Sequence, residues 1–252
     1  MGKSLCSEFS VARQVLDELD SILGRKLSSL IFNGPIEELT ITENAQLAIM
    51  AVSIATLRVM DHAFGRSLFS GCNVQYVCGY SVGEYTALCA AGALTLESAV
   101  RLLKVRSKAM HEASMRCKGG MVALLGAEIS EVEDILKSAK ISGVCEFAND
   151  NGGEQVSGPF HSSLMKPANE KLLKFLESVT VTRPLIPFVS NVTAKEESDP
   201  EIMICLLSKS YAKVTYWNNI REICFTKQNT CQLYHSIGRK LASNTPSSGF
   251  IP

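Results

Sequence analysis

One short segment constrains this chain more than any other: residues 77–85 read VCGYSVGEY. It places Ser81 in the pattern G-x-S-x-G, after an apolar run typical of a buried strand (75–78) and before a run with helical spacing (82–91). In that context the pattern predicts a sharp strand-to-helix turn that projects the serine hydroxyl out of a sheet. We expect both glycines to be required, because side chains two residues away from Ser81 on either side would clash.

Ser81 is therefore the predicted nucleophile, and the N–H of Val82, at the start of the helix, is the predicted donor to a developing oxyanion. A serine hydroxyl also needs a base. His161 stands in the turn SGPFHSS directly before a helical segment, where a loop can carry a side chain across the mouth of a sheet. We predict that His161 is the general base and acid, whereas His62 and His111 lie on helices and are expected to pack or to face solvent.

The alternation of strand and helix patterns along the chain predicts an α/β fold with a mostly parallel sheet. Hydrophobic residues make up 46% of the 252 residues, enough to bury the core of one large domain. Helical spacing covers residues 10–22, 45–64, 96–117, 130–140, 162–178 and 200–210. Short apolar runs typical of strands cover residues 121–125, 143–148 and 186–190.

Charge and cysteine usage exclude several classes of protein. Basic and acidic residues both number 25, so no basic excess points to a nucleic-acid partner. The nine cysteines form no C-x-x-C pair and no zinc-ligand spacing with histidine, so we expect no metal site and reduced thiols. The longest apolar stretch, 47–57, is too short to span a bilayer, and we identify no secretory signal. We therefore expect a cytoplasmic protein with no membrane partner.

Two segments of this chain resemble the signature sequences of a known enzyme family. Residues 79–85 resemble the G-H-S-x-G-E-Y signature of malonyl-CoA:acyl carrier protein transacylases, with Tyr80 in place of the histidine. Residues 157–168, SGPFHSSLMKPA, resemble the second signature of that family, which carries its catalytic histidine. Residues 43–46 (ENAQ) and 187–192 (PFVSNV) also stand in the family's order, and the resemblance runs from Met1 to about Trp217.

The resemblance implies an α/β-hydrolase-like parallel-sheet domain made of residues 1–118 and 157–252, interrupted by a ferredoxin-like small subdomain at 119–156. Family members build that subdomain from two strand–helix–strand halves. Residues 120–148 supply one half, so we expect a truncated subdomain. Such enzymes also open with a strand and a G-Q-G-S-Q loop that serves the oxyanion hole, and this sequence begins past that loop.

The resemblance further implies that Ser81 takes a malonyl group from malonyl-CoA and passes it to acyl carrier protein, in fatty acid biosynthesis. It assigns the malonyl carboxylate to Arg106 and places Val82 and Asn191 among the substrate-binding residues. A backbone carbonyl from segment 207–217 is implied to orient the histidine. No metal and no redox cofactor is implied, because coenzyme A is part of the substrate. We expect a monomer.

Two alternatives stay open at this point. A serine hydrolase would share the elbow, but this chain has no H-G-G run and its acidic residues between Ser81 and His161 lie mostly on predicted surface helices. A catalytically impaired or inactive remnant, able at most to bind acyl carrier protein, would follow from the missing oxyanion loop and half-subdomain.

Overall fold

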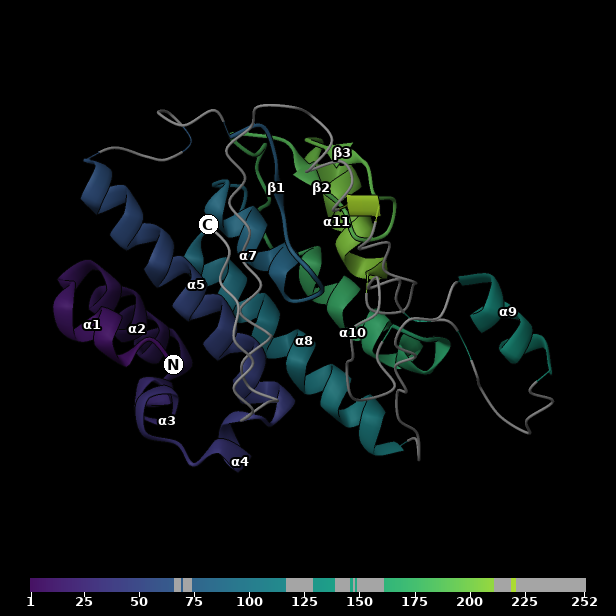
Figure 1. The fold of residues 1–252 in the computed structure, drawn as a ribbon, viewed down its shortest axis with the longest axis horizontal. Helices are drawn as coiled ribbons and strands as arrows, with labels where there is room; N and C mark the ends of the chain where they lie inside the picture. Colours follow the sequence, from purple (N-terminus) through teal and green to yellow (C-terminus); the bar gives the residue numbers. More distant parts are fainter. Residues whose placement is uncertain are drawn as a thin grey trace.

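Long helices make up most of the described chain, and a small sheet lies beside them (Figure 1). The structure, a computed structural model, describes residues 1–65, 69, 74–116, 129–138, 146, 148, 161–210 and 219–220. The helices of the N-terminal half are α1 (Lys3–Glu8), α2 (Ser10–Leu23), α3 (Leu27–Asn33), α4 (Ile36–Leu39) and α5 (Thr42–Phe64). They are followed by α7 (Gly83–Ala90), α8 (Leu96–Arg116), α9 (Ile129–Ser138), the short 3-10 helix η1 (Ser163–Met165), α10 (Lys166–Leu176) and α11 (Pro200–Lys209).

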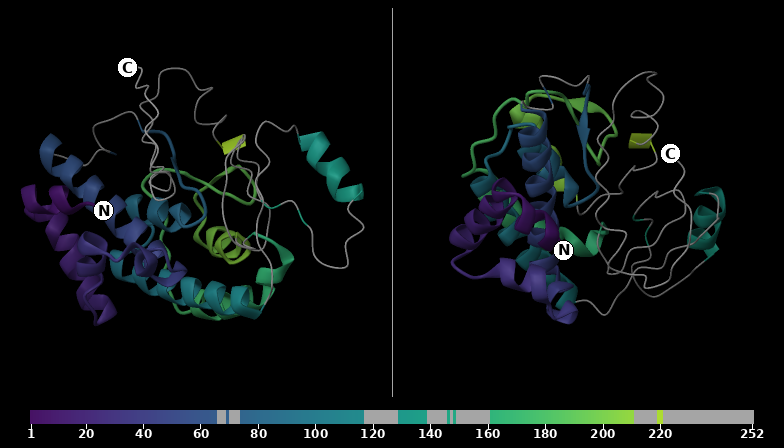
Figure 2. Two further views of the ribbon diagram at one scale, coloured as in Figure 1. Left: turned by 60° about the horizontal axis from the view of Figure 1, so that its bottom comes forward. Right: turned by 60° about the vertical axis from the view of Figure 1, so that its left-hand side comes forward.

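Helix α5 occupies the centre of the helical layer. It packs against α2 on one side and against α8 and α7 on the other, while α10 runs along α8 (Figure 2). Because neighbours cover α5 on several sides, apolar residues occur all round it. Among the described helices α5 is the one long and apolar enough to cross a membrane by length and composition. Its packing inside the protein accounts for that composition.

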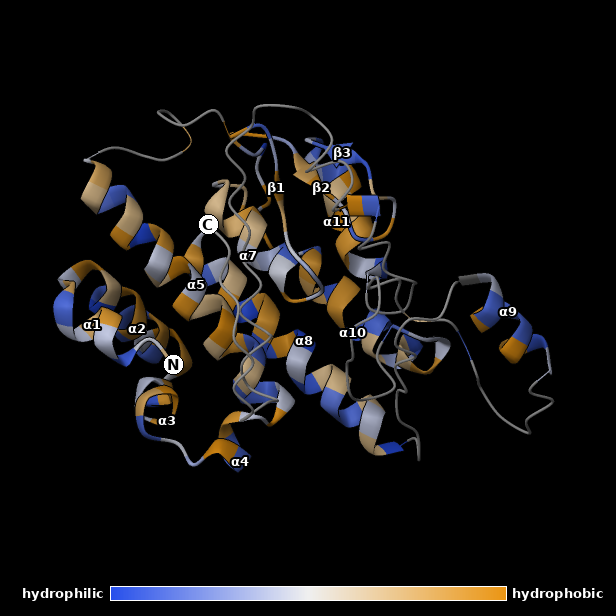
Figure 3. Ribbon diagram, viewed as in Figure 1, coloured by the Kyte–Doolittle hydropathy of each residue, from blue (hydrophilic) through white to orange (hydrophobic). Residues whose placement is uncertain are grey.

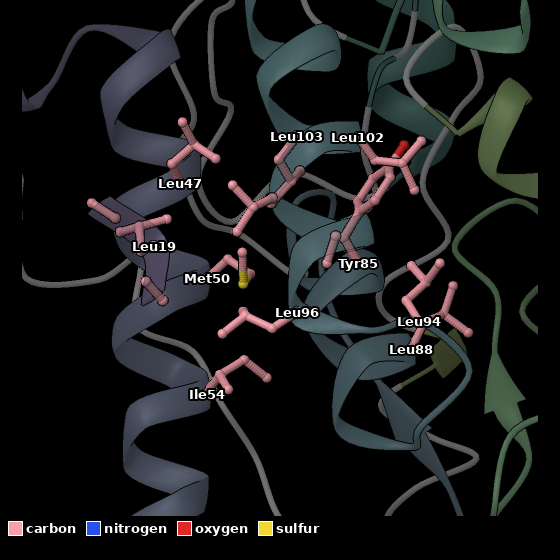
Figure 4. Close-up of a cluster of buried hydrophobic side chains, with 14 of the residues drawn as sticks. Leu19, Leu47, Met50, Ile54, Tyr85, Leu88, Leu94, Leu96, Leu102 and Leu103 are labelled. Carbon is pink, nitrogen blue, oxygen red and sulfur yellow. The ribbon is translucent and has the colours of Figure 1, made fainter. Parts of the chain in front are cut away.

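The core lies between these helices. Apolar residues line the facing sides of α5, α7 and α8, as the hydropathy colouring in Figure 3 shows. Leu47 and Met50 of α5 lie opposite Leu103 of α8, and Tyr85 of α7 lies near Leu102 (Figure 4). Each of these side chains is at most 2% exposed, so this part of the core is shielded from solvent.

Three short strands form the described sheet, in the order β1 (Val77–Cys78), β2 (Phe188–Val189) and β3 (Glu196–Glu197). Strands β1 and β2 are parallel, with Val77 opposite Phe188, and β3 is antiparallel to β2. Parallel pairing brings the carboxyl ends of β1 and β2 to the same edge of the sheet. The residues that follow these strands, Ser81 and Asn191, therefore meet there although 110 positions separate them.

The predicted α/β class is confirmed, and the long helices match their predicted segments within a few residues. Helices α1, α3 and α4 were not predicted, because with 6, 7 and 4 residues they are too short to show a clear apolar period. Strand β3 was not predicted either. Its two residues are both glutamate, and it adds an antiparallel edge to a sheet expected to be mostly parallel.

Part of the predicted small subdomain lies outside the described residues. The predicted strand at 121–125 falls there, and of the predicted strand at 143–148 only residues 146 and 148 are described, neither of them in a strand. Helix α9, Ile129–Ser138, is present where a helix was predicted at 130–140. The division into residues 1–118 with 157–252 and a small subdomain at 119–156 stays a prediction.

The packing between α5 and α8 predicts a large stability loss on truncation. Leu103 is 0% exposed, so Leu103→Ala should lower the free energy of unfolding by about 2–5 kcal/mol through lost burial and a residual cavity. Leu173→Ala on α10 is the control, because Leu173 is 40% exposed and should lose far less. Urea denaturation of both variants measures this, and equal losses would contradict the assignment of Leu103 to the core.

Candidate active site

The elbow around Ser81 has the geometry that its sequence pattern predicts. Ser81 joins β1 to α7 with a φ of 54°, in the left-handed region that a side chain rarely adopts. The turn closes through hydrogen bonds from Gly83 N to Tyr80 O (2.8 Å) and from Glu84 N to Ser81 O (3.2 Å). The hydroxyl of Ser81 is thereby held at the carboxyl edge of the sheet.

The two glycines of the pattern differ in their roles. A Cβ added at Gly79 would lie 2.0 Å from the carbonyl oxygen of Gly83, which is impossible without moving the backbone. A Cβ added at Gly83 would meet no described atom within 4 Å. The prediction that sterics require glycine at both positions is therefore wrong for Gly83. A Cβ on this first residue of α7 would clash with no described atom.

His161 and Ser81 are brought together as predicted. His161 Nε2 lies 3.1 Å from Ser81 Oγ, and His161 Nδ1 lies 2.8 Å from the carbonyl oxygen of Ser210. Because a carbonyl can only accept, Nδ1 carries the proton and Nε2 is left to receive one from Ser81. Ser210 lies within 207–217, so the expectation of an orienting backbone carbonyl from that segment is confirmed.

A buried side chain of α8, Arg106, also contacts Ser81. Its guanidinium is 1% exposed on α8, and Nη2 donates to Ser81 Oγ at 3.0 Å. Nη1 donates to the side-chain oxygen of Gln46 on α5, and the guanidinium carbon lies 5.4 Å from the centre of the Tyr85 ring. The arrangement presents a buried cation, fixed on two sides, to whatever is attached to Ser81.

Asn191, which the sequence places among the substrate-binding residues, is fully buried beneath the elbow. Its Oδ1 accepts a hydrogen bond from Ser81 N at 2.7 Å, and its Nδ2 donates to Gly79 O, also at 2.7 Å. The side-chain amide thus spans the turn from Gly79 to Ser81. In this position Asn191 holds the strained backbone of the nucleophile.

Glu84 lies directly behind Asn191 and is also fully buried. Its Oε1 accepts a hydrogen bond from Asn191 N at 2.8 Å. Burial raises the pKa of the Glu84 carboxyl to about 7, against the opposing effects of Asn191 N–H, the Ser210 hydroxyl and the Arg106 charge. Oε2 accepts no hydrogen bond from any described residue, and the Ser210 hydroxyl donates to the carbonyl oxygen of Leu207 at 3.4 Å.

Sequence reasoning missed the parts played by Gln46 and Glu84. Each is a polar residue next to apolar residues of its helix, and the structure buries both, at 8% and 0% exposure. Tyr80, which replaces the usual histidine, places its ring centre 6.1 Å from that of His161. Val82 is the N-cap of α7 and stands next to Ser81.

In the described part of the chain no group of three or more His, Cys, Asp or Glu residues is arranged to hold a metal.

The contrast between the glycines predicts opposite results for two alanine variants. Gly79→Ala should slow the reaction of Ser81 with a fluorophosphonate probe by at least about tenfold, because displacing a reactive group by roughly 1 Å can cost a hundredfold. Gly83→Ala is the matched control and should keep both the labelling rate and the melting temperature. Intact mass spectrometry follows the labelling, and equal loss in both variants would contradict the geometry.

Comparisons with known proteins agree with this arrangement. Residues 1–150 match the acyl transferase domain family. The malonyl CoA-acyl carrier protein transacylase of Bacillus subtilis (strain 168) is 35% identical over 254 residues, covering 88% of this chain and 78% of the relative. The crystal structure of the acyl-carrier-protein-S-malonyltransferase from Bartonella henselae matches with a TM-score of 0.83 at 37% identity, covering 90% of this chain and 81% of that one.

A further structure is similar, that of a malonyl-transacylase in complex with a type II PKS acyl-carrier protein. It has a TM-score of 0.76 at 27% identity and covers 88% of this chain and 80% of the other. The sequence identity, the coverage and the elbow around Ser81 all indicate the same family. The chain belongs to the acyl transferase domain family and, within it, to the malonyl-CoA:acyl carrier protein transacylases.

Proposed function

We propose that this chain transfers a malonyl group from malonyl-CoA to acyl carrier protein, in fatty acid biosynthesis, through an acyl-enzyme on Ser81. One observation carries the proposal: the Ser81 hydroxyl lies 3.1 Å from an imidazole nitrogen of His161 and 3.0 Å from a buried guanidinium nitrogen of Arg106. A base and a cation thus both lie within hydrogen-bond distance of the same nucleophile. That combination suits an acyl group that carries a carboxylate.

In the first half-reaction Ser81 Oγ attacks the thioester carbonyl of malonyl-CoA and gives its proton to His161 Nε2. The N–H of Val82, the N-cap of α7, is the proposed donor to the oxyanion that forms. When the carbon–sulfur bond breaks, His161 returns the proton to the departing thiolate of coenzyme A. The Ser210 carbonyl stabilises the intermediate imidazolium through Nδ1–H.

The second half-reaction reverses these roles with a different thiol. The phosphopantetheine thiol of acyl carrier protein gives its proton to His161 Nε2 and attacks the Ser81 ester carbonyl. The carbon–oxygen bond to Ser81 then breaks, and the serine oxygen recovers the proton from His161. The products are malonyl-acyl carrier protein and the free enzyme, so no other reactant is consumed.

Arg106 is the proposed ligand of the malonyl carboxylate. A planar guanidinium can meet a carboxylate with two parallel hydrogen bonds, and burial strengthens both. Gln46 and the Tyr85 ring hold the guanidinium in place on the sides away from Ser81. The hydrogen bond to Ser81 Oγ is then the one that a carboxylate would take over. Action in the cytoplasm and as a monomer belongs to the same proposal.

The proposal predicts a covalent intermediate. Incubation of the purified protein with malonyl-CoA should give a malonyl adduct by intact mass, and peptide mapping should place it on Ser81. Ser81→Ala should abolish it, because that variant lacks the nucleophile. A folded wild-type protein that never takes up the malonyl group would instead favour the impaired remnant. Rapid loss of the adduct to water without acyl carrier protein would favour a hydrolase.

Arg106 predicts the preference for a charged acyl group. Arg106→Ala should lower the ratio of malonyl to acetyl transfer by roughly tenfold to a hundredfold, because hydrogen bonds to charged groups contribute about 1.5–3 kcal/mol. Arg101→Ala is the control, since Arg101 lies on the same helix with its side chain 60% exposed and paired with Glu97. Competition between the two acyl-CoA substrates measures the ratio. An unchanged preference in Arg106→Ala would reject the assignment.

A further inference from the structure

The proposed base, His161, has a strained backbone. Its φ is 59°, in the left-handed region that a residue with a side chain rarely adopts. Both ring nitrogens have partners, Ser81 Oγ and Ser210 O, but those contacts act on the ring and not on the backbone that carries it. A strained backbone persists only where the surrounding structure holds it. The contacts of the residues next to His161 therefore bear on where the imidazole lies.

The chain that leaves His161 is anchored in the apolar core only at the end of η1. Met165 is the first fully buried apolar side chain after the histidine, and the buried face of α10 continues from it with Ala168, Leu172 and Leu176. Helix α10 is thus held by the core. The connection between His161 and Met165 is held by a polar contact as well.

Glu146 makes this polar contact from 17 positions earlier in the chain. Its Oε2 accepts from the backbone N–H of Ser163 at 2.7 Å, and its Oε1 accepts from the Ser163 hydroxyl, also at 2.7 Å. Ser163 is the first residue of η1 and lies two positions after the base. The first N–H groups of a helix have no partner within the helix, so the carboxylate satisfies a donor that η1 itself leaves unpaired.

The same contact keeps the Glu146 carboxyl charged. The hydroxyl and the N–H of Ser163 hold the pKa of this carboxyl below its usual value, so it is ionised at neutral pH. Hydrogen bonds to an ionised acceptor are shorter and stronger than those between neutral groups. Two such bonds to one residue fix its orientation as well as its distance.

We propose that Glu146 is a positioning residue for His161: by fixing Ser163 with two hydrogen bonds, it holds the backbone that carries the imidazole 3.1 Å from Ser81 Oγ. Glu146 belongs to residues 119–156, which the sequence assigns to the small subdomain. That segment then contributes to the placement of the base through one carboxylate. Proton transfer between Oγ and Nε2 is sensitive to displacements of about 1 Å.

Variants of Glu146 test this role, which rests on the proposed function for its kinetic readout. Glu146→Ala removes both acceptors, so kcat should fall about fivefold or more, because a displaced base slows proton transfer. KM for malonyl-CoA should change little, since Arg106 is intact. Glu146→Gln can still accept from Ser163 N and can donate its amide N–H to Ser163 Oγ, so kcat should stay within about twofold of wild type.

Further variants separate positioning from a loss of stability. Glu170→Ala removes another exposed glutamate, on α10, and should behave as wild type. Ser163→Ala removes the hydroxyl and keeps the N–H, so its kcat should lie between those of the wild type and Glu146→Ala, and the double variant should be no slower than Glu146→Ala. The melting temperature of Glu146→Ala should stay within about 2 °C of wild type, because the contact is exposed.

Four results would overturn the proposal. Glu146→Ala with wild-type kcat is the first, and a loss of activity confined to KM is the second. The third is a Glu146→Gln variant as impaired as Glu146→Ala, since the two hydrogen bonds would then be irrelevant. The fourth is a fall in kcat accompanied by a fall in melting temperature of more than about 5 °C, which would assign Glu146 to stability alone. Circular dichroism measures the melting temperatures.

Labelling of Ser81 by a fluorophosphonate probe separates a failure of this inference from a failure of the proposed function. The probe needs an aligned serine and histidine but no malonyl group. If the wild type reacts with the probe and not with malonyl-CoA, the proposed substrate fails and the labelling rates decide the role of Glu146. A fall of about fivefold or more in Glu146→Ala supports it, and an unchanged rate rejects it. A wild-type serine that reacts with neither reagent would overturn both.

Discussion

The side-chain amide of Asn191 makes hydrogen bonds to two residues of the turn that carries the nucleophile, and the rest of the site depends on this contact. Ser81 has a left-handed backbone, which costs free energy for a residue with a side chain and persists only where other contacts hold it. The amide of Asn191 supplies those contacts, through Ser81 N and Gly79 O. The parallel pairing of β1 with β2 delivers Asn191 to that place. The backbone geometry of the nucleophile therefore depends on the pairing of the strands in the sheet.

An arginine and a carboxylic acid, Arg106 and Glu84, are buried next to this elbow. Each is unfavourable alone, and each is stabilised by named contacts: Gln46, Ser81 and the Tyr85 ring for the guanidinium, Asn191 N–H for the carboxyl. The two differ in what they present to the nucleophile. Arg106 donates to the Ser81 hydroxyl itself, whereas Glu84 accepts from Asn191, which holds the backbone of Ser81.

The sequence predicted the helices of eight or more residues because they are long enough to show apolar residues at helical spacing. The four-residue helix α4 and the two-residue strand β3 carry no such period. Ser81 was predictable because its turn leaves a pattern in consecutive residues. Asn191 was assigned to the substrate from its family context, and that assignment stays a prediction. The structure buries Asn191 under the turn, and only the pairing of β1 with β2 shows what its amide contacts.

By itself the sequence determined the α/β class, the elbow, and the candidates Ser81, His161 and Arg106, because each depends on local spacing or on a short motif. Only the tertiary structure decided which carbonyl holds the imidazole, which glycine is sterically required and which backbone N–H the buried Glu84 carboxyl accepts from. The physical reason is that hydrogen bonds and steric contacts act over about 3 Å in space. The partners here are up to 112 positions apart along the chain, so no local pattern records them.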